Sequence, residues 1–241
     1  MNRVILSAST DETILAVTRQ HKLVDLEIEQ QINTEIVGCI YKGVVKNIVP
    51  AVDGIFVDIG IGKNAFLRRK DLLNEKRFPT EGSPILAQVT KSDTDMKGAL
   101  ITEKISMFGK YAVTLSGTGY IGVSKKIRQE SVRKRLKEIG KEICAEHMGL
   151  IIRTAAENAD MDEFRKDITR LKENWDIIQK RFRMEKSPTL LYRESDIIVK
   201  ALRDYVNKGT EILITDNRKI YERICKLNES EHTCLLYTSP S

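Results

Sequence analysis

The chain has 241 residues, of which 41% are hydrophobic and 31% are charged, and its formal net charge is +6. This length allows one large domain or two to three small ones, each with its own core. No run approaches the roughly 18 apolar residues of a membrane span, and residues 1–17 lack the apolar core of a signal peptide, so we expect a cytoplasmic protein. The 4 cysteines and 3 histidines are scattered, so their spacing indicates neither a disulfide framework nor a metal site.

Residues 3–29 predict three β-strands. The segments "RVILSAS" and "TILAVTR" are joined by a turn at residues 10–12, and "KLVDLEIE" follows with alternating apolar and polar side chains. A polar link, "QQINTE", leads from these strands to the next unit.

Residues 36–105 read as short strands separated by Gly, Pro and Asp turns. Five such strands over about 70 residues are typical of a small Greek-key barrel of the OB type. The turn "GIGK" at residues 60–63 is not a phosphate-binding loop, because the spacing between its glycines is wrong and a strand follows it instead of a helix.

The hairpin "GIFVDIGIGKNAFL", residues 54–67, carries a phenylalanine on each arm. If its turn centres on Ile61, Phe56 and Phe66 face each other across the two strands. They could fill the barrel core, or they could form an outward platform on which bases stack. The pattern alone leaves both interpretations open.

Residues 106–189 mix strands and helices. "GKYAVTL" and "YIGVSKKI" predict a strand pair, residues 129–144 a helix, and "MGLII" a further strand. The strongest helical period follows, with spacings 4-3-4-3-4 from Phe164 to Phe182; it places Trp175 in the core, with Asp160 as N-cap and Glu163 at N3.

The positive charge is concentrated in residues 122–141, which hold 8 Lys or Arg and 2 Glu. Such a stripe on an otherwise neutral chain is either a binding surface for a polyanion or a solvated helix face. Both interpretations remain open at this point.

Residues 190–227 alternate strand, helix, strand and helix, with Asp216 expected as the N-cap of the last helix. This α/β pattern could complete the sheet begun at residues 3–29. Residues 228–241 have no amphipathic pattern, so we expect a tail that is disordered or not native coding sequence.

The segments "IYKGVVKNIVPAVDGIFVDIGIGKNAFLRRKDL" and "EGSPILAQVTKSDTDMKGALITEKIS" closely resemble the S1 RNA-binding domain of the ribonuclease E/G family. Later segments keep the likeness in order, among them "GVSKKI", "MGLIIRTAA", "FRKDITRLKENWDII" and "LLYRESDIIVKALRDY". The likeness runs from residue 1 to about residue 225. This ordered series identifies the chain as a member of the family.

The resemblance implies an α/β plus all-β fold. An RNase H-like α/β subdomain (1–35 and 190–227) would be interrupted by an S1 barrel of the OB type (36–105) and a mixed α/β 5′-sensor region (106–189), with residues 228–241 left as the tail. The implied activity is endonucleolytic cleavage of single-stranded RNA in rRNA processing and mRNA decay in bacteria, often favoured by a 5′-monophosphate end.

In the family, aspartates of a following DNase I-like subdomain hold Mg²⁺, and a cysteine pair beyond it binds a shared zinc. Neither segment is visible here, so the sequence looks like an N-terminal portion. Asp11 falls in a turn, Asp58 in the barrel and Asp216 at a helix start, and the first strand has no carboxylate. We therefore name no catalytic or metal-binding residue, expect no cofactor bound by this chain, and expect this chain alone to be inactive.

The family's RNA-channel phenylalanines match Phe56 and Phe66, and the lysine beside that channel matches Lys97 in "MKGALIT". The alternative is that Lys97 is a solvated loop residue that makes no contact with RNA. This resemblance raises the platform interpretation of the two phenylalanines above core packing.

The family's pocket for the 5′-terminal phosphate matches Gly109, Val113, Arg153 and Thr154. An arginine fork suits a terminal phosphate because it donates two bonds to two oxygens. The alternative for Arg153 is a strand-end salt bridge. The motif continues Thr-Ala-Ala where glycine often follows in the family, which puts the loop conformation in doubt. Lys125 and Lys126 are assigned to general attraction of RNA.

The leading interpretation is therefore the RNA-binding and 5′-end-sensing part of a single-strand-specific endoribonuclease, with 5′-monophosphorylated RNA as partner. The alternative is a non-catalytic S1-type RNA-binding protein acting on mRNA or ribosomes. A homo-oligomer remains open for the full-length protein.

Overall fold

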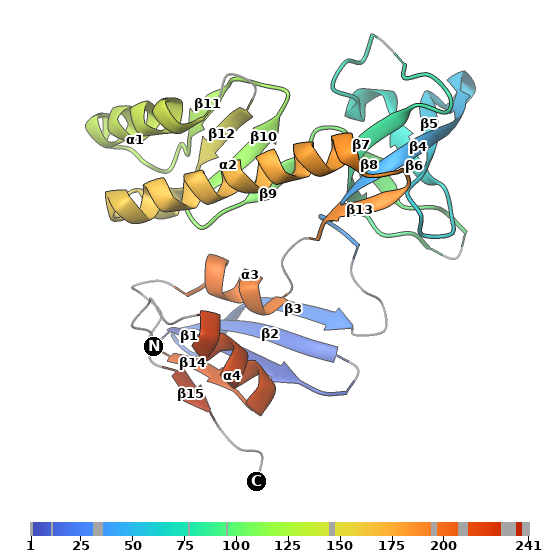
Figure 1. Ribbon diagram of the computed structural model, residues 1–241. Helices are drawn as coiled ribbons and strands as arrows, with labels where there is room; N and C mark the ends of the chain where they lie inside the picture. The colour runs from blue at the N-terminus through green and yellow to red at the C-terminus, as the bar shows by residue number, and fades with distance from the viewer. Residues whose placement is uncertain are drawn as a thin grey trace. The chain divides into compact units, whose positions relative to one another are not determined.

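A computed structural model describes residues 2–10, 12–30, 36–76, 78–94, 96–144, 148–193, 197–206, 212–227 and 235–237. The chain forms two compact units (Figure 1), which are treated separately below. Unit 1 consists of Met1–Glu35 and Ser195–Ser241, and unit 2 of Ile36–Glu194. Asp11, the link at residues 31–35 and Cys234 lie outside the described residues.

Unit 1 is built on a five-stranded sheet with the order β15-β14-β1-β2-β3. Strands β14 and β15 run parallel to β1, whereas β2 and β3 form an antiparallel meander. The predicted strands at residues 3–29 are confirmed. The strand bounds are Asn2–Ala8 (β1), Glu12–Arg19 (β2), Lys22–Gln30 (β3), Ile212–Thr215 (β14) and Leu235–Tyr237 (β15).

Helices α3 (Ile197–Asp204) and α4 (Arg218–Leu227) cover one face of this sheet. Their apolar side chains share one core with alternate residues of β1, β2 and β14, because successive strand residues point to opposite faces. Strand β15 comes from the segment predicted as an unpatterned tail, so part of that tail belongs to the sheet.

The N-cap of α4 differs from the prediction. Asn217 holds that position, since its Oδ1 accepts the backbone N–H groups of Lys219 and Ile220 at 2.9 and 3.2 Å. Asp216 instead accepts from Ser7 Oγ and from the Ala8 backbone N–H at the end of β1. The expected cap was one residue too early because Asp216 is held by a strand that is distant in sequence.

Unit 2 begins with a closed barrel. Its strands follow the order β4-β5-β6-β8-β7, and a further pairing of β4 with β7 closes the ring. Its core consists of the inward residues of all five strands. The bounds are Ile40–Val49 (β4), Gly54–Asp58 (β5), Ala65–Arg68 (β6), Pro84–Lys91 (β7) and Leu100–Thr102 (β8).

Strand β13, Thr189–Tyr192, extends the barrel sheet by pairing antiparallel with β4. This pairing differs from the prediction that residues 190–227 belong together in the α/β part. The expectation failed at its first strand because a strand's partner is a long-range choice that the local pattern does not encode.

The second part of unit 2 is a four-stranded sheet, here called the small sheet, with the order β11-β12-β10-β9. The expected pairing of "GKYAVTL" with "YIGVSKKI" is wrong: β12 lies between them, antiparallel to β10 and parallel to β11. Strand β9 was not predicted. The bounds are Ser106–Phe108 (β9), Ala112–Ser116 (β10), Ile121–Val123 (β11) and Met148–Ile152 (β12).

Helices α1 (Glu130–Ile143) and α2 (Met161–Met184) pack on one face of the small sheet. The predicted caps of α2 are confirmed: Asp160 accepts the N–H groups of Asp162 and Glu163 at 2.8 and 3.3 Å. Trp175 packs against this core. No helix in the described part of the chain is both long and apolar enough to cross a membrane.

The far end of α2 is fixed to the barrel. Lys42 of β4 is nearly buried, and its Nζ donates to the carbonyls of Phe182 and Glu185 at 2.7 and 2.6 Å. A lysine at this end of a helix both satisfies orphan carbonyls and complements the helix dipole. The helix therefore links the small sheet to the barrel within unit 2.

Buried polar contacts also join the barrel to the small sheet. Gln88 of β7 is 4% exposed. Its Nε2 donates to the carbonyls of Gly38 and Ser106 at 2.9 and 2.8 Å, and its Oε1 accepts the Ser106 N–H at 2.9 Å. An amide that satisfies three groups fixes the chain where the barrel ends and β9 begins.

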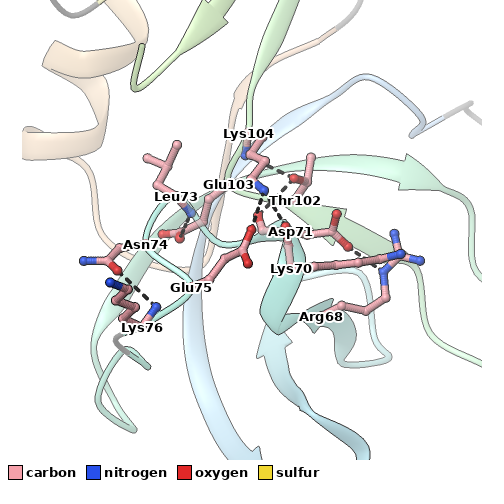
Figure 2. A network of polar contacts seen from close by, with 10 residues as sticks. All are labelled: Arg68, Lys70, Asp71, Leu73, Asn74, Glu75, Lys76, Thr102, Glu103 and Lys104. Atoms are coloured by element: carbon pink, nitrogen blue, oxygen red, sulfur yellow. Dashed lines mark hydrogen bonds and ion pairs between the residues drawn. The ribbon is translucent and has the colours of Figure 1, made fainter.

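Figure 2 shows a second network at the same junction, where the segment after β6 meets the end of β8. Glu103 accepts the Leu73 N–H at 3.0 Å, and Thr102 Oγ1 donates to the Asp71 carbonyl at 3.1 Å. Burial raises the pKa of Glu103 above its ordinary value, although the Leu73 N–H partly offsets that effect. These contacts hold the loop that follows the aromatic hairpin.

Candidate nucleic-acid interface

Phe56 and Phe66 lie directly opposite each other on β5 and β6. Their ring centroids are 5.4 Å apart and the ring planes are tilted by 50°. Both side chains are half-buried, whereas their strand neighbours Ile55, Val57, Ala65 and Leu67 are fully buried in the barrel core. Alternation along the strands therefore turns the aromatic pair to the outside of the barrel.

Gly54 provides the space in which the Phe66 ring lies. A Cβ at this position would overlap Cε2 and Cζ of Phe66, so a larger residue would displace the ring. The glycine at the start of the hairpin is thus explained by the close approach of an aromatic ring to the backbone.

The aromatic pair is the middle of a row that crosses five strands. The register places Asn47 beside Phe56, Leu100 beside Phe66, and Lys91 beside Leu100. Asn47 and Lys91 are exposed and Leu100 is half-buried. We call these residues the barrel row: Asn47, Phe56, Phe66, Leu100 and Lys91. No local pattern predicts that Asn47, Leu100 and Lys91 join this row, because they come into line only when the barrel closes.

Lys97 is exposed on the loop between β7 and β8. Thr94 and Lys97 exchange two backbone hydrogen bonds, of 2.8 and 3.3 Å, which makes this loop a tight turn. The loop is tied to the aromatic hairpin, since Lys63 Nζ donates to the Thr94 carbonyl at 2.9 Å and the Phe66 N–H donates to Ala99 at 2.7 Å. The ammonium group therefore belongs to the same end of the barrel as the hairpin turn.

The second group of candidate residues meets at one end of the small sheet. Arg153 directly follows β12, and its Nη1 donates to the Gly109 carbonyl at 2.8 Å. Its backbone N–H donates to Tyr111 at 2.8 Å, which fixes the strand end beside the turn between β9 and β10. The hydroxyls of Thr154 and Ser124 are 3.0 Å apart.

Val113 completes this group from β10. The register pairs it with Phe108 on one side and Ile151 on the other, on the sheet face opposite the helices. We call Gly109, Val113, Arg153 and Thr154 the Arg153 pocket. Gly109 and Arg153, which are 44 positions apart in the sequence, are thus in contact. The guanidinium of Arg153, the hydroxyl of Thr154 and the apolar side chain of Val113 lie at the same end of the small sheet.

Asp167 of α2 holds the turn that carries Gly109 of this pocket. It is 6% exposed and accepts the backbone N–H groups of Lys110 and Tyr111 at 3.2 and 2.8 Å. Arg170 donates to the same carboxylate at 2.9 Å. Gly109 lies so close to Asp167 that a Cβ would overlap the carboxylate oxygen. Sequence reasoning missed Asp167, because an acidic residue inside a helical period is usually read as solvent-exposed.

The basic segment 122–141 divides into two roles. Arg133 points inward, where its guanidinium donates to the carbonyls of Ser124 and Ile127 at 2.7 and 2.9 Å. The other basic side chains of the segment are exposed, namely Lys125, Lys126, Arg128, Lys134, Arg135, Lys137 and Lys141. The segment is therefore mostly an exposed positive surface, and its first part reaches the Arg153 pocket through the contact of Ser124 with Thr154, whereas Arg133 holds the fold.

Within the described ranges, no group of three or more His, Cys, Asp or Glu side chains is placed to hold a metal ion. The half-buried thiol of Cys144 is also a poor ligand or nucleophile, because burial raises its pKa to about 11. The described part of the chain offers surfaces suited to binding a polyanion.

Two protein-family models match this chain, and one of them is the model of an RNA-binding domain. Residues 106–235 match the model of the ribonuclease E/G family, and residues 34–102 match that of the S1 RNA binding domain. The barrel described above is thus an S1 domain of the OB type.

Several relatives align with nearly the whole chain. Ribonuclease G of Escherichia coli K12 is 32% identical over 238 residues, which are 92% of this chain and 49% of that protein. Ribonuclease E of Buchnera aphidicola, from Schizaphis graminum, is 31% identical over 239 residues, 25% of its length. The chain spans about half the length of the ribonuclease G relatives that it matches. The family model covers more than half of the chain, and the chain therefore belongs to the ribonuclease E/G family.

Proposed function

We propose that this chain is the RNA-binding and 5′-end-sensing part of a single-strand-specific endoribonuclease of RNA processing and decay. The observation that supports this most directly is the outward-facing pair of Phe56 and Phe66 on a closed S1 barrel. In this proposal unit 1 is the RNase H-like subdomain, and the small sheet with α1 and α2 is the 5′ sensor.

The barrel row has the composition that single-stranded RNA requires. Two aromatic faces can stack on bases of any sequence, and Lys91 and Lys97 can contact the backbone phosphates. The row crosses five strands, so several nucleotides can lie along it. Stacking that tolerates any base suits a nuclease with loose sequence preference.

Replacing Phe56 or Phe66 with alanine is expected to weaken binding of a single-stranded RNA by about 1–3 kcal/mol each, the usual contribution of one stacked base. The cause is the loss of an aromatic face. Fluorescence anisotropy with a labelled oligonucleotide at several salt concentrations measures this change, and the affinity of the parent chain should fall as salt rises.

Two controls separate stacking from folding. Phe66→Tyr keeps the aromatic face and should keep the affinity, and Met184→Ala removes a side chain that is 74% exposed at the end of α2 and is not part of the barrel row. If Phe56→Ala and Phe66→Ala bind RNA like the parent chain, or lose the folded circular-dichroism signal, then these two residues do not form a stacking platform for bases.

The Arg153 pocket is proposed to bind the 5′-terminal phosphate. A guanidinium fork matches phosphate oxygens in two parallel hydrogen bonds, and the Thr154 hydroxyl adds a donor. The contact of Arg153 with Gly109 fixes one arm of the fork, so the group is oriented before the phosphate arrives. Such pre-orientation favours affinity because less side-chain freedom is lost on binding.

Cleavage is proposed for the whole protein, in the cytoplasm, and not for the residues described here. The family implies Mg²⁺ and a shared zinc, but the described side chains form no group that could hold either ion. We therefore derive no chemical step from these residues.

The 241-residue chain is expected to bind fluorescent single-stranded RNA without cutting it, in the presence or absence of Mg²⁺, because a metal-assisted hydrolysis needs carboxylates around the ion and an activated water. Gel analysis of incubated RNA measures this. Internal cuts that require Mg²⁺, stop with EDTA and follow the protein through purification would contradict it.

A further inference from the structure

The outward face of the small sheet carries a row of side chains that extends beyond the Arg153 pocket. The register places Phe108, Val113 and Ile151 side by side on neighbouring strands, and Gly122 of β11 continues the line after Ile151. The opposite face packs against α1 and α2. This row therefore lies on the face of the sheet that the helices leave uncovered.

Tyr120 occupies the surface above Gly122. A Cβ on that glycine would lie 2.7 Å from Cε1 and 3.2 Å from the hydroxyl of Tyr120, so the phenol ring lies over the glycine backbone. Phe108, Ile151 and Tyr120 are 43%, 39% and 64% exposed. The row thus has an aromatic side chain at each end and two aliphatic side chains between them. We call Phe108, Val113, Ile151 and Tyr120 the small-sheet row.

The dimensions of this row fit a short piece of a nucleic-acid strand. Neighbouring strands lie about 4.8 Å apart, so the distance from β9 to β11 is about 14 Å, enough for two or three bases. Ile151 and Arg153 are two residues apart and project to the same side, about 7 Å from each other. A phosphate at Arg153 would therefore leave its base over Val113 and Ile151.

The charges around the row favour a polyanion over an apolar peptide. Lys110 lies in the turn between β9 and β10, Lys125 and Lys126 follow β11, and Arg153 ends β12. Exposed aromatic side chains on a sheet with basic residues at its margin are a common way of holding single-stranded RNA. All of these basic residues therefore lie at the same edge of the small sheet, the edge at which β12 ends beside Arg153.

We infer that the small-sheet row binds the bases of the first two or three nucleotides of a single-stranded RNA, counted from the phosphate in the Arg153 pocket. Tyr120 stacks on the nucleotide farthest along the row in the direction of β11. This inference rests on the proposed function, because it requires a 5′ end held at Arg153. It adds a base-binding track, and it explains the exposed positions of Tyr120, Ile151 and Phe108.

Photocross-linking of the parent chain tests this track without any substitution. A 5′-monophosphorylated oligonucleotide carries 5-iodouridine at its second or third position, and a matched strand carries it at the eighth. After irradiation, mass spectrometry identifies the modified residue. Cross-links to Tyr120 or Phe108 from the second or third position, but not from the eighth, are the expected result.

Substitutions supply the matching affinities for a short 5′-monophosphorylated strand. Tyr120→Ala is expected to lower the affinity about fivefold or more, whereas Tyr120→Phe should keep it because the stacking face remains. Ile151→Ala should weaken binding, and Ile177→Ala, at an isoleucine that is 55% exposed on α2, should not.

The outcomes separate this inference from the function on which it rests. If Tyr120→Ala and Ile151→Ala bind like the parent chain and neither aromatic residue cross-links, while Phe56→Ala and Arg153→Ala still weaken binding, the track is wrong and the proposed function stands. If none of these four substitutions changes the affinity, the proposed function fails as well.

Discussion

Replacing Asp167 with alanine is expected to lower the free energy of unfolding of unit 2 by about 2–4 kcal/mol. The carboxylate is 6% exposed and accepts two backbone N–H groups, of Lys110 and Tyr111, together with Arg170. Alanine would remove the acceptor of the buried Tyr111 N–H and of the partly buried Lys110 N–H. Urea or thermal unfolding followed by circular dichroism measures the change.

The same helix offers a matched control. Asp176 has a side chain that is 59% exposed and that forms an ion pair with Lys172 at 2.7 Å. Asp176→Ala should change the stability by no more than about 0.5 kcal/mol, because an exposed pair of this kind contributes little. Asp167→Asn keeps one acceptor oxygen and should fall between the two alanine variants. If Asp167→Ala and Asp176→Ala lower the free energy of unfolding equally, then the buried carboxylate of Asp167 does not stabilise unit 2 more than an exposed one does.

The loss should extend to binding, because Asp167 holds the turn that contains Gly109 and Lys110. Arg153 donates to the Gly109 carbonyl, so a displaced turn also releases one arm of the fork. We therefore expect the folded Asp167→Ala variant to lose any preference for a 5′-phosphate, at a temperature well below its unfolding transition. In this way one buried carboxylate links the packing of α2 to the proposed pocket.

Local patterns predicted those features that depend on neighbours in sequence. The 4-3-4-3-4 period and the Asp160 cap specified α2, and the alternation in residues 3–29 specified three strands. The facing of Phe56 and Phe66 followed from a turn centred on Ile61, because a symmetric hairpin determines its own register. In each case the deciding interaction spans a few residues along the chain.

Features that depend on distant partners were not predictable in this way. Strand β12 separates β10 from β11 and overturns the expected pair, and β13 joins the barrel although its sequence neighbours belong to unit 1. Asp216 pairs with the end of β1, across 209 positions, so the cap of α4 moves to Asn217. Lys91 and Leu100 entered the barrel row only through closure of the barrel.

Arg153→Ala is expected to abolish a preference for 5′-monophosphorylated RNA over the same strand with a 5′-hydroxyl. Hydrogen bonds to a charged group contribute about 1.5–3 kcal/mol, so the affinity for the phosphorylated strand should fall about tenfold to 100-fold. The hydroxyl strand offers the fork no terminal phosphate, and its affinity should stay nearly unchanged. Paired anisotropy titrations with the two strands measure this difference.

Two further variants distinguish recognition of the 5′ end from general attraction. Arg153→Lys keeps the positive charge but loses the planar fork, so part of the preference should survive. Arg135 is exposed on α1 within the basic segment. Arg135→Ala should lower the affinity for the two RNA strands by the same factor, because it removes only a nonspecific phosphate contact. If Arg153→Ala also weakens both strands equally, then Arg153 acts as one more surface cation and the 5′ end is not read in this pocket.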